Sequence, residues 1–323
     1  SSGATMSIFA VDKGPLLSGS MGAVTAWRTI PWEKAIHPCV TYGNSGGVYL
    51  VGVATTTRLR VRQITGMPTS PTLTVIGTPI TPSWGLPPNA PQKGTNATLD
   101  TLDARLMNAV YRNGSIWTAH CVSVGGRAGI RWYEIEAPSA TTVQAGTVSD
   151  TSLHFYMPGI SVNAKDEMIV GFTGSDNNTF AGTWLTGRVP SDPIDETGVP
   201  VLYHAGEGPY TVQTSSGSNR WGDYSLTSVD PLDDETFWTI QEYAPVGNGW
   251  ATHIARADFS CTASTYCTPK ITSKLCAPSM TWSGSPTLAL PQGFQVRCES
   301  MDPNVSAIVF FGLSGADAKP FQG

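Results

Sequence analysis

The feature of this sequence that most constrains its fold is a hairpin-like pattern that occurs four times along the chain. In each copy, a segment of polar and small residues ends in valine or isoleucine, and a turn with asparagine, aspartate or glycine follows. A second segment then carries aromatic and aliphatic residues. Turn residues between two such segments are typical of β-hairpins. The copies begin near residues 38, 107, 157 and 222, so they predict a repeat protein built from one β-unit.

The distance between successive copies indicates the type of repeat. It is about 50 to 70 residues, which corresponds to propeller blades of ~40–50 residues enlarged by insertions. Each unit has room for four strands and shows no helical periodicity, so we predict an all-β fold with a β-propeller of at least four blades. Four blades are near the lower limit for closure. The family resemblance given below implies further blades, so we expect the propeller to be either incomplete or completed by other chains. A β-sandwich is the alternative architecture, although it does not ordinarily repeat its hairpin in this way.

The character of the sequence changes at Phe259, after which Cys, Thr, Ser and Lys become frequent. We therefore predict a β-propeller over residues 1–258 and a small Cys-containing C-terminal β module over residues 259–323. Most of the cysteines fall in this module; the full set is Cys39, Cys121, Cys261, Cys267, Cys276 and Cys298. Their clustering predicts disulfides and an exported protein. Zinc is disfavoured because no Cys-x-x-Cys spacing occurs and no histidine is near.

Composition excludes several classes of partner. Charged residues make up only 13% of the chain, and the net charge of −5 is spread without runs. We therefore expect no nucleic-acid binding, which requires clustered Lys and Arg, and no electrostatic membrane-surface role. We also expect no membrane insertion, because no apolar run reaches the roughly 18 residues of a transmembrane helix. The chain begins at Ser1 directly before an expected strand, so we expect a mature or trimmed product.

The fourth copy of the hairpin carries the densest group of chemically useful side chains. We expect Asp223 and Tyr224 to lie on its first strand, which in a propeller lines the central channel. The candidate catalytic residues are Arg220, Asp223, Tyr224 and Glu242. The candidate ligand-binding residues are Trp221 and, from neighbouring blades, Tyr111, His120 and Tyr156. The alternative role for the same side chains is to hold one blade to the next through hydrogen bonds.

The turn of the same hairpin is acidic. Asp230, Asp233 and Asp234 could bind Ca²⁺ through their carboxylate oxygens. Acidic turns are more often simply solvated, so the alternative is a turn without a metal. We predict no required cofactor, with Ca²⁺ as the one candidate ion.

Three segments carry a resemblance to a known group of proteins: residues 105–120, 219–243 and 266–322. They are similar to secreted bacterial proteins of largely unassigned function that have sialidase-like β-propeller repeats and a C-terminal export-associated β module. This resemblance implies a secreted protein at the cell surface or in the extracellular space. The match to sialidases themselves is looser, because Ser228-x-Asp230 is followed by Thr236-Phe237-Trp238 without the expected glycine.

These observations leave three functions open. The first is an extracellular glycan- or surface-binding module, whose partner would be a polysaccharide or a cell-surface component. The second is a sialidase-like glycoside hydrolase or lyase, since Arg220, Asp223, Tyr224 and Glu242 have the residue types that sialidase chemistry uses. The third is a structural subunit of an extracellular assembly in which other chains supply the missing blades.

Overall fold

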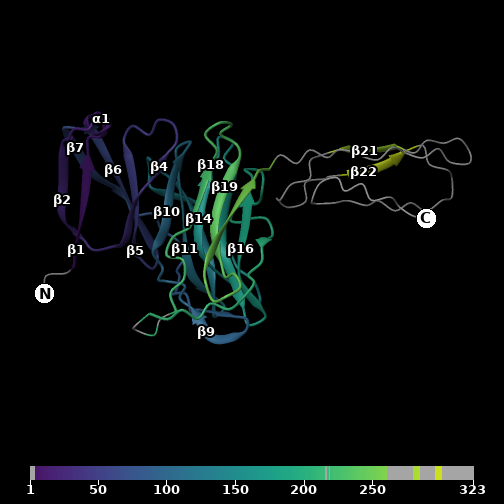
Figure 1. Cartoon of the computed structure of the whole chain (residues 1–323). Helices are drawn as coiled ribbons and strands as arrows, with labels where there is room; N and C mark the ends of the chain where they lie inside the picture. The colour runs from purple at the N-terminus through teal and green to yellow at the C-terminus, as the bar shows by residue number, and fades with distance from the viewer. Residues whose placement is uncertain (1–3, 215–216, 218, 260–278, 284–294, 300–323) are drawn as a thin grey trace, which may run out of the picture. The chain divides into compact units, whose positions relative to one another are not determined.

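The computed structural model of the protein describes residues 4–214, 217, 219–259, 279–283 and 295–299. This part of the chain is all-β apart from one short helix, α1 (Lys13–Leu17), as Figure 1 shows. The chain divides into two compact units, Ser1–Asp258 and Phe259–Gly323, at the point where the composition changes. Among the described residues, no helix is long and apolar enough to span a membrane.

The second unit contains one described pair of antiparallel strands, β21 (Ser279–Ser283) and β22 (Gln295–Glu299). The disulfides of this unit remain a prediction. The structure does not describe four of the groups concerned, which are Cys261, Cys267, Cys276 and the side chain of Cys298. In the first unit, Cys39 and Cys121 are free and buried. Burial raises the pKa of Cys121 to about 12, so this thiol is protonated and unreactive at neutral pH.

Antiparallel sheets make up the first unit, and four of them follow one another in chain order. The first sheet contains β3 (Lys34–Pro38), β5 (Val48–Thr55), β6 (Arg58–Met67) and β7 (Ser70–Gly77). The second contains β10 (Leu106–Arg112), β11 (Ser115–Val124), β12 (Arg127–Glu136) and β13 (Thr141–Val148), with the short β4 (Val40–Thr41) at its edge. The third contains β14 (His154–Val162), β15 (Met168–Asp176), β16 (Thr179–Arg188) and β17 (Val201–His204). The fourth contains β18 (Leu226–Val229), β19 (Phe237–Tyr243) and β20 (Ala251–Ala257).

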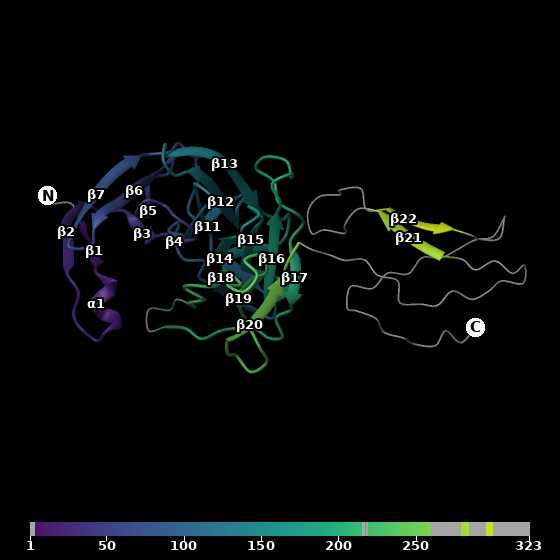
Figure 2. The same cartoon turned by 90° about the horizontal axis from the view of Figure 1, so that it is seen from above.

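Two small two-stranded sheets complete the unit. One pairs β1 (Thr5–Val11) with β2 (Val24–Pro31), and the other pairs β8 (Ala90–Gln92) with β9 (Thr95–Leu99). Within the four larger sheets, strands that are consecutive in the sequence are neighbours, apart from the inserted β4. The first strands β3, β10, β14 and β18 contact one another in series. Figure 2 shows the four sheets in the same order around an arc.

The hydrophobic core lies between successive sheets. The first interface buries Val51 and Val61 of the first sheet against Ile116 and Ile135 of the second. The second interface buries Trp117 and Trp132 of the second sheet, whose rings stack 6.0 Å apart, with Phe155, Ile160 and Phe172 of the third. Every residue of β14 and β15 is buried, as expected for strands covered on both faces.

The predicted asparagine–glycine turn joins β10 to β11. Asn113 and Gly114 both have positive φ, 47° and 89°, and Arg112 pairs with Ser115 across the turn. Two left-handed residues form the tight turn whose twist matches that of a hairpin. This part of the sequence prediction is confirmed, because the turn depends only on residues next to one another in the chain.

Two of the predicted hairpins begin elsewhere. In the first copy, the strand opposite β5 is β3, while Val40 and Thr41 pair in parallel with β10 of the second sheet. In the fourth copy, Asp223 and Tyr224 do not lie on a strand, because β18 begins only at Leu226. Gly222 and Asp223 have positive φ, 63° and 84°, which an extended strand cannot accommodate.

Candidate functional site

A pocket of about 680 Å³ lies at one end of the first unit. It is lined by residues at the start of β10 and β18, the end of β19 and the start of β20. The turns of the β10–β11 and β18–β19 hairpins lie at the opposite end of these strands. The loop that precedes β18, residues 219–225, supplies the remaining wall together with Tyr210. We call this loop the pocket loop.

The side chains of Asn219 and Trp221 anchor the pocket loop to the core. Asn219 donates a side-chain hydrogen bond to the carbonyl of Tyr210 (2.7 Å), and Trp221 is only 2% exposed. The indole of Trp221 packs edge-on to Tyr210, and its Nε1 donates to the hydroxyl of Thr173 (3.3 Å). This hydroxyl donates in turn to the carbonyl of Glu242 (3.1 Å). The third sheet therefore holds both the loop and the end of β19 in place.

After Trp221 the backbone of the loop turns sharply. The N–H of Asp223 bonds back to the carbonyl of Trp221 (2.9 Å), with Gly222 left-handed between them. A Cβ on Gly222 would lie 2.9 Å from the Met157 side chain, so glycine is required both by its conformation and by the lack of space. Asp223 and Met157 also have positive φ, 84° and 55°. Backbone strain of this kind is often concentrated at functional sites.

Glu242 is the acid of the pocket. Its carboxyl is half-buried, and desolvation raises its pKa to about 7, with a further contribution from the nearby charge of Asp223. A hydrogen bond from the backbone N–H of Gly222 opposes this rise. A carboxyl with a pKa near neutrality can either donate or accept a proton at physiological pH.

A charged group lies at the mouth of the pocket. Arg220 forms an ion pair with Asp223, and both side chains are about half exposed. An exposed pair of this kind contributes little to stability, so its main effect is to orient the two side chains. Tyr224 is 59% exposed. Its hydroxyl interacts with Arg105, and the pKa of Arg105 is raised chiefly by its hydrogen bond to Asp103 and also by the one to Tyr224.

Sequence reasoning missed several residues of the pocket. Trp250, which lines it, is 63% exposed, and the turn Gly247-Asn248-Gly249 before it was the available signal. Gln241 also lines it and is 1% exposed, and its Oε1 has no hydrogen-bond partner within the described residues. Asn108 bonds both the N–H and the carbonyl of Ile160, so it joins β10 to β14.

Three residues expected to bind a ligand belong to the core instead. Tyr111 is 8% exposed and stacks on Tyr49 with ring centroids 5.3 Å apart. Tyr156 is fully buried, and its hydroxyl bonds that of Ser175 (2.9 Å). The strands that carry these residues are covered by neighbouring sheets, so their aromatic side chains face protein and not the pocket.

His120 is the third of these residues. It is fully buried between the carbonyl of Ala104 (2.9 Å) and the hydroxyl of Tyr133 (3.0 Å). Desolvation lowers its pKa to about 4, so the ring is neutral at physiological pH. Of the predicted site residues, the structure therefore brings together Arg220, Trp221, Asp223, Tyr224 and Glu242.

The carboxylates of the acidic turn between β18 and β19, which are the candidate calcium ligands, accept hydrogen bonds or form ion pairs within the protein. The Thr236 hydroxyl (2.6 Å) and the N–H groups of Glu235 and Thr236 (2.9 Å each) donate hydrogen bonds to the carboxylate of Asp233, and these bonds lower its pKa to about 2. Asp234 pairs with Arg112, and Asp230 accepts the indole N–H of Trp238 (2.9 Å). Within the part of the chain that the structure describes, no three His, Cys, Asp or Glu residues are placed to hold a metal ion.

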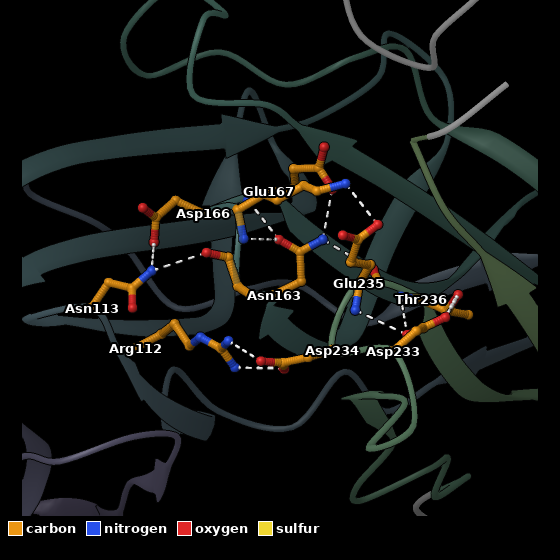
Figure 3. Close-up of polar contacts among 11 residues, drawn as sticks. Arg112, Asn113, Asn163, Asp166, Glu167, Asp233, Asp234, Glu235 and Thr236 are labelled. Atoms are coloured by element: carbon orange, nitrogen blue, oxygen red, sulfur yellow. Dashed lines mark hydrogen bonds and ion pairs between the residues drawn. The ribbon is translucent and has the colours of Figure 1, made fainter.

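These polar groups instead connect the turns of three neighbouring sheets, as Figure 3 shows. The Asn113 amide donates to the carboxylate of Asp166 (2.8 Å), which joins the second sheet to the third. The Asn163 amide donates to the carbonyl of Glu235 (2.9 Å), which joins the third sheet to the fourth. Hydrogen bonds between neighbouring sheets, the alternative role that we considered for the pocket residues, are thus present at this end of the strands as well as at the pocket.

Comparison with known proteins adds no identification. A scan against protein-family models finds no family that matches the chain. A search of curated proteins finds no significant match.

Proposed function

We propose that the first unit is a saccharide-binding domain and that the pocket beside Glu242 is its binding site. The observation that carries this proposal is the combination of two exposed aromatic rings, Tyr224 and Trp250, with charged groups around one open pocket. Such rings offer an apolar face with a polar edge, and a sugar ring has an apolar face and polar hydroxyls. Arg220, Asp223 and Glu242 supply hydrogen-bonding groups for those hydroxyls.

The proposed architecture is a β-propeller with the four sheets as blades. Its support is the strand order, in which consecutive antiparallel strands run from an inner first strand outwards. The series of contacts between the first strands gives further support. We propose that the pocket opens at the mouth of the central channel and that other blades, from this protein or another chain, complete the ring.

The proposed partner is a polysaccharide or a cell-surface component outside the cell. The resemblance to secreted bacterial proteins supports an extracellular location, as does the clustering of cysteines after residue 259. A domain that presents an open pocket and exposed aromatic side chains is suited to binding chains anchored on a surface.

A glycan array followed by titration calorimetry tests the proposal. Replacing an exposed ring removes its stacking contact, so Trp250→Ala should weaken binding of the selected saccharide by about fivefold, the equivalent of ~1 kcal/mol. Trp32→Ala is the matched control, because Trp32 is similarly exposed (56% against 63%) and does not line the pocket. Equal affinity of the Trp250→Ala variant and the wild type would exclude this site. If no glycan binds and the chain assembles into larger particles, a structural subunit is the better description.

A second candidate function is that of a sialidase-like glycoside hydrolase or lyase, and one observation favours it. Glu242, with a pKa of about 7, lies within electrostatic reach of the carboxylate of Asp223. A protonated carboxyl next to an ionised one is the pair that glycosidases use as acid and as base or nucleophile. Tyr224 is an alternative nucleophile, and Arg220 would bind an acidic substrate group.

Product analysis after incubation with the bound oligosaccharide separates the two functions. If the protein is an enzyme, Glu242→Gln should abolish turnover while the saccharide still binds, because glutamine cannot transfer a proton. Tyr224→Phe and Asp223→Asn then identify the nucleophile. If the wild type binds the saccharide and releases no product, the site is a binding site only.

A further inference from the structure

Two histidines of neighbouring sheets stack directly on each other in the first unit. His204 ends β17 of the third sheet, and His253 lies in β20 of the fourth. Their imidazole rings are nearly parallel, 8° apart, with ring centroids 4.2 Å apart. Tyr243 of β19 packs edge-on to His204, also at 4.2 Å. The pair therefore forms a contact between the outer strands of the two sheets.

Within the part of the chain that the structure describes, the pair makes one ion-pair contact. The carboxylate of Glu207, in the segment after β17, lies 3.8 Å from His204 Nε2. Tyr203 of β17 packs 5.9 Å from His253, and Tyr243 contributes its ring from β19. From β16, Thr183 lies opposite His204 and carries no charge. Glu207 can thus interact favourably with one added proton, whereas among the described residues no second carboxylate lies at ion-pair distance from the two rings.

The pair is connected to the pocket through its immediate neighbours in sequence. Thr252 precedes His253 and Glu242 precedes Tyr243, and both line the pocket. Because adjacent residues of a strand are rigidly linked, a change in the distance between β17 and β20 changes the position of this pocket wall.

We propose that His204 and His253 form a proton-operated latch between the third and fourth sheets, which holds the pocket wall in its ligand-binding position at neutral pH and lets it move in acid. The effect on ligand binding rests on the proposed saccharide site, whereas the latch itself does not. With both rings neutral, stacking and packing hold the sheets together. With both rings protonated, two like charges face each other at 4.2 Å and push the strands apart.

The direction of the pH dependence follows from the pKa of His253. Desolvation lowers this pKa below its ordinary value of 6.5, and the charge of His204 lowers it further. The unfolded chain then binds more protons than the folded protein between the two values. The latch therefore contributes its full stability above pH 6.5 and loses it as the pH falls through 6.5 towards the folded pKa.

Nuclear magnetic resonance titration of the five histidines tests the coupling without any ligand. In His204→Phe the aromatic ring remains but its charge is lost, so the pKa of His253 should rise towards 6.5. An unchanged His253 titration in a folded His204→Phe protein would overturn the proposal. If His204→Phe does not fold, His204→Gln serves for the same measurement.

A second experiment measures the affinity of the wild type and of His253→Phe for the saccharide selected on the array, at pH 7 and at pH 5. The wild type should lose at least about threefold more affinity in acid than His253→Phe, the equivalent of half a pKa unit of coupling. Because His253 does not line the pocket, the variant should match the wild type at pH 7. Equal losses in both proteins would refute control of the pocket by the latch. Absence of any saccharide binding would refute the proposed function, and the titration would still decide on the latch.

Discussion

Replacing Glu242 by glutamine should make the protein more stable at alkaline pH and leave it unchanged in acid. The side chain of Glu242 is half-buried at the pocket wall, and desolvation raises its pKa to about 7 from an ordinary 4.5. The folded protein therefore favours the protonated carboxyl. Glutamine has nearly the same shape as this neutral form, so the variant carries no ionisation penalty at any pH.

The expected difference in unfolding free energy follows from how far the pKa of Glu242 is raised. Each tenfold change in a protonation equilibrium is worth about 1.4 kcal/mol, so a rise from 4.5 to about 7 corresponds to roughly 3 kcal/mol. Because the carboxyl keeps part of its surface in contact with solvent, we expect water to reduce this to about 2 kcal/mol. Between pH 4.5 and about 7 the folded state binds more protons than the unfolded chain, so the stability of the wild type falls as the pH rises.

Urea denaturation at pH 4, 6, 7 and 8 measures the effect. The difference in unfolding free energy between Glu242→Gln and the wild type should be near zero at pH 4 and reach about 2 kcal/mol in favour of the variant at pH 8. Glu196→Gln, at an exposed position, is the control and should show no such trend. A difference that stays constant from pH 4 to pH 8 would refute the assignment of a raised pKa to Glu242.

Three further substitutions test a buried ion pair, a close contact between two sheets and the backbone of a turn, each by urea unfolding. Glu33→Gln should cost about 3 kcal/mol, because buried Arg62 loses the carboxylate that accepts its two hydrogen bonds (2.6 and 2.9 Å); a cost under ~1 kcal/mol would contradict a buried ion pair. Gly171→Ala should cost about 1–3 kcal/mol, because the added methyl would lie 2.2 Å from a hydroxyl of β19. Its control is Gly85→Ala, where the nearest atom is 3.6 Å away, and equal effects would argue against the clash. Asn113→Ala should cost about 1 kcal/mol more than Asn113→Gly, because only the alanine is strained at a φ of 47°. Equal losses would mean that backbone strain plays no part and that the lost side-chain hydrogen bonds, such as the one to Asp166, explain the effect.

The all-β character and several hairpins could be predicted because their signals are local. The turn at Asn113 and Gly114 requires only two residues that tolerate positive φ, and the structure places them there. The pairing of strands from different units depends on contacts far apart in the sequence. Val40 and Thr41 leave their own hairpin and pair with β10, which begins 66 positions after Val40, and nothing in the residues around Val40 indicates this.

The candidate site was predicted in part for the same reason. Arg220, Asp223, Tyr224 and Glu242 do lie around one pocket, and their density in the sequence pointed to them. Tyr111 and His120 have equally suitable chemistry but are buried. Alternation along a strand tells which residues share a face, but only the placement of the next sheet decides whether that face meets protein or solvent.

The pocket combines features that each reduce the stability of the fold. Gly222, Asp223 and Met157 have left-handed backbone in close proximity, which costs energy for the two residues that have a side chain. A half-buried carboxyl favours the unfolded chain above pH 7. Trp250 is 63% exposed and packs little of its ring against the protein. The contacts between sheets come largely from the buried core and from hydrogen bonds of other residues. Their coincidence around one pocket is what we expect of a ligand site, and it supports the proposed function whether the ligand is only bound or also cleaved.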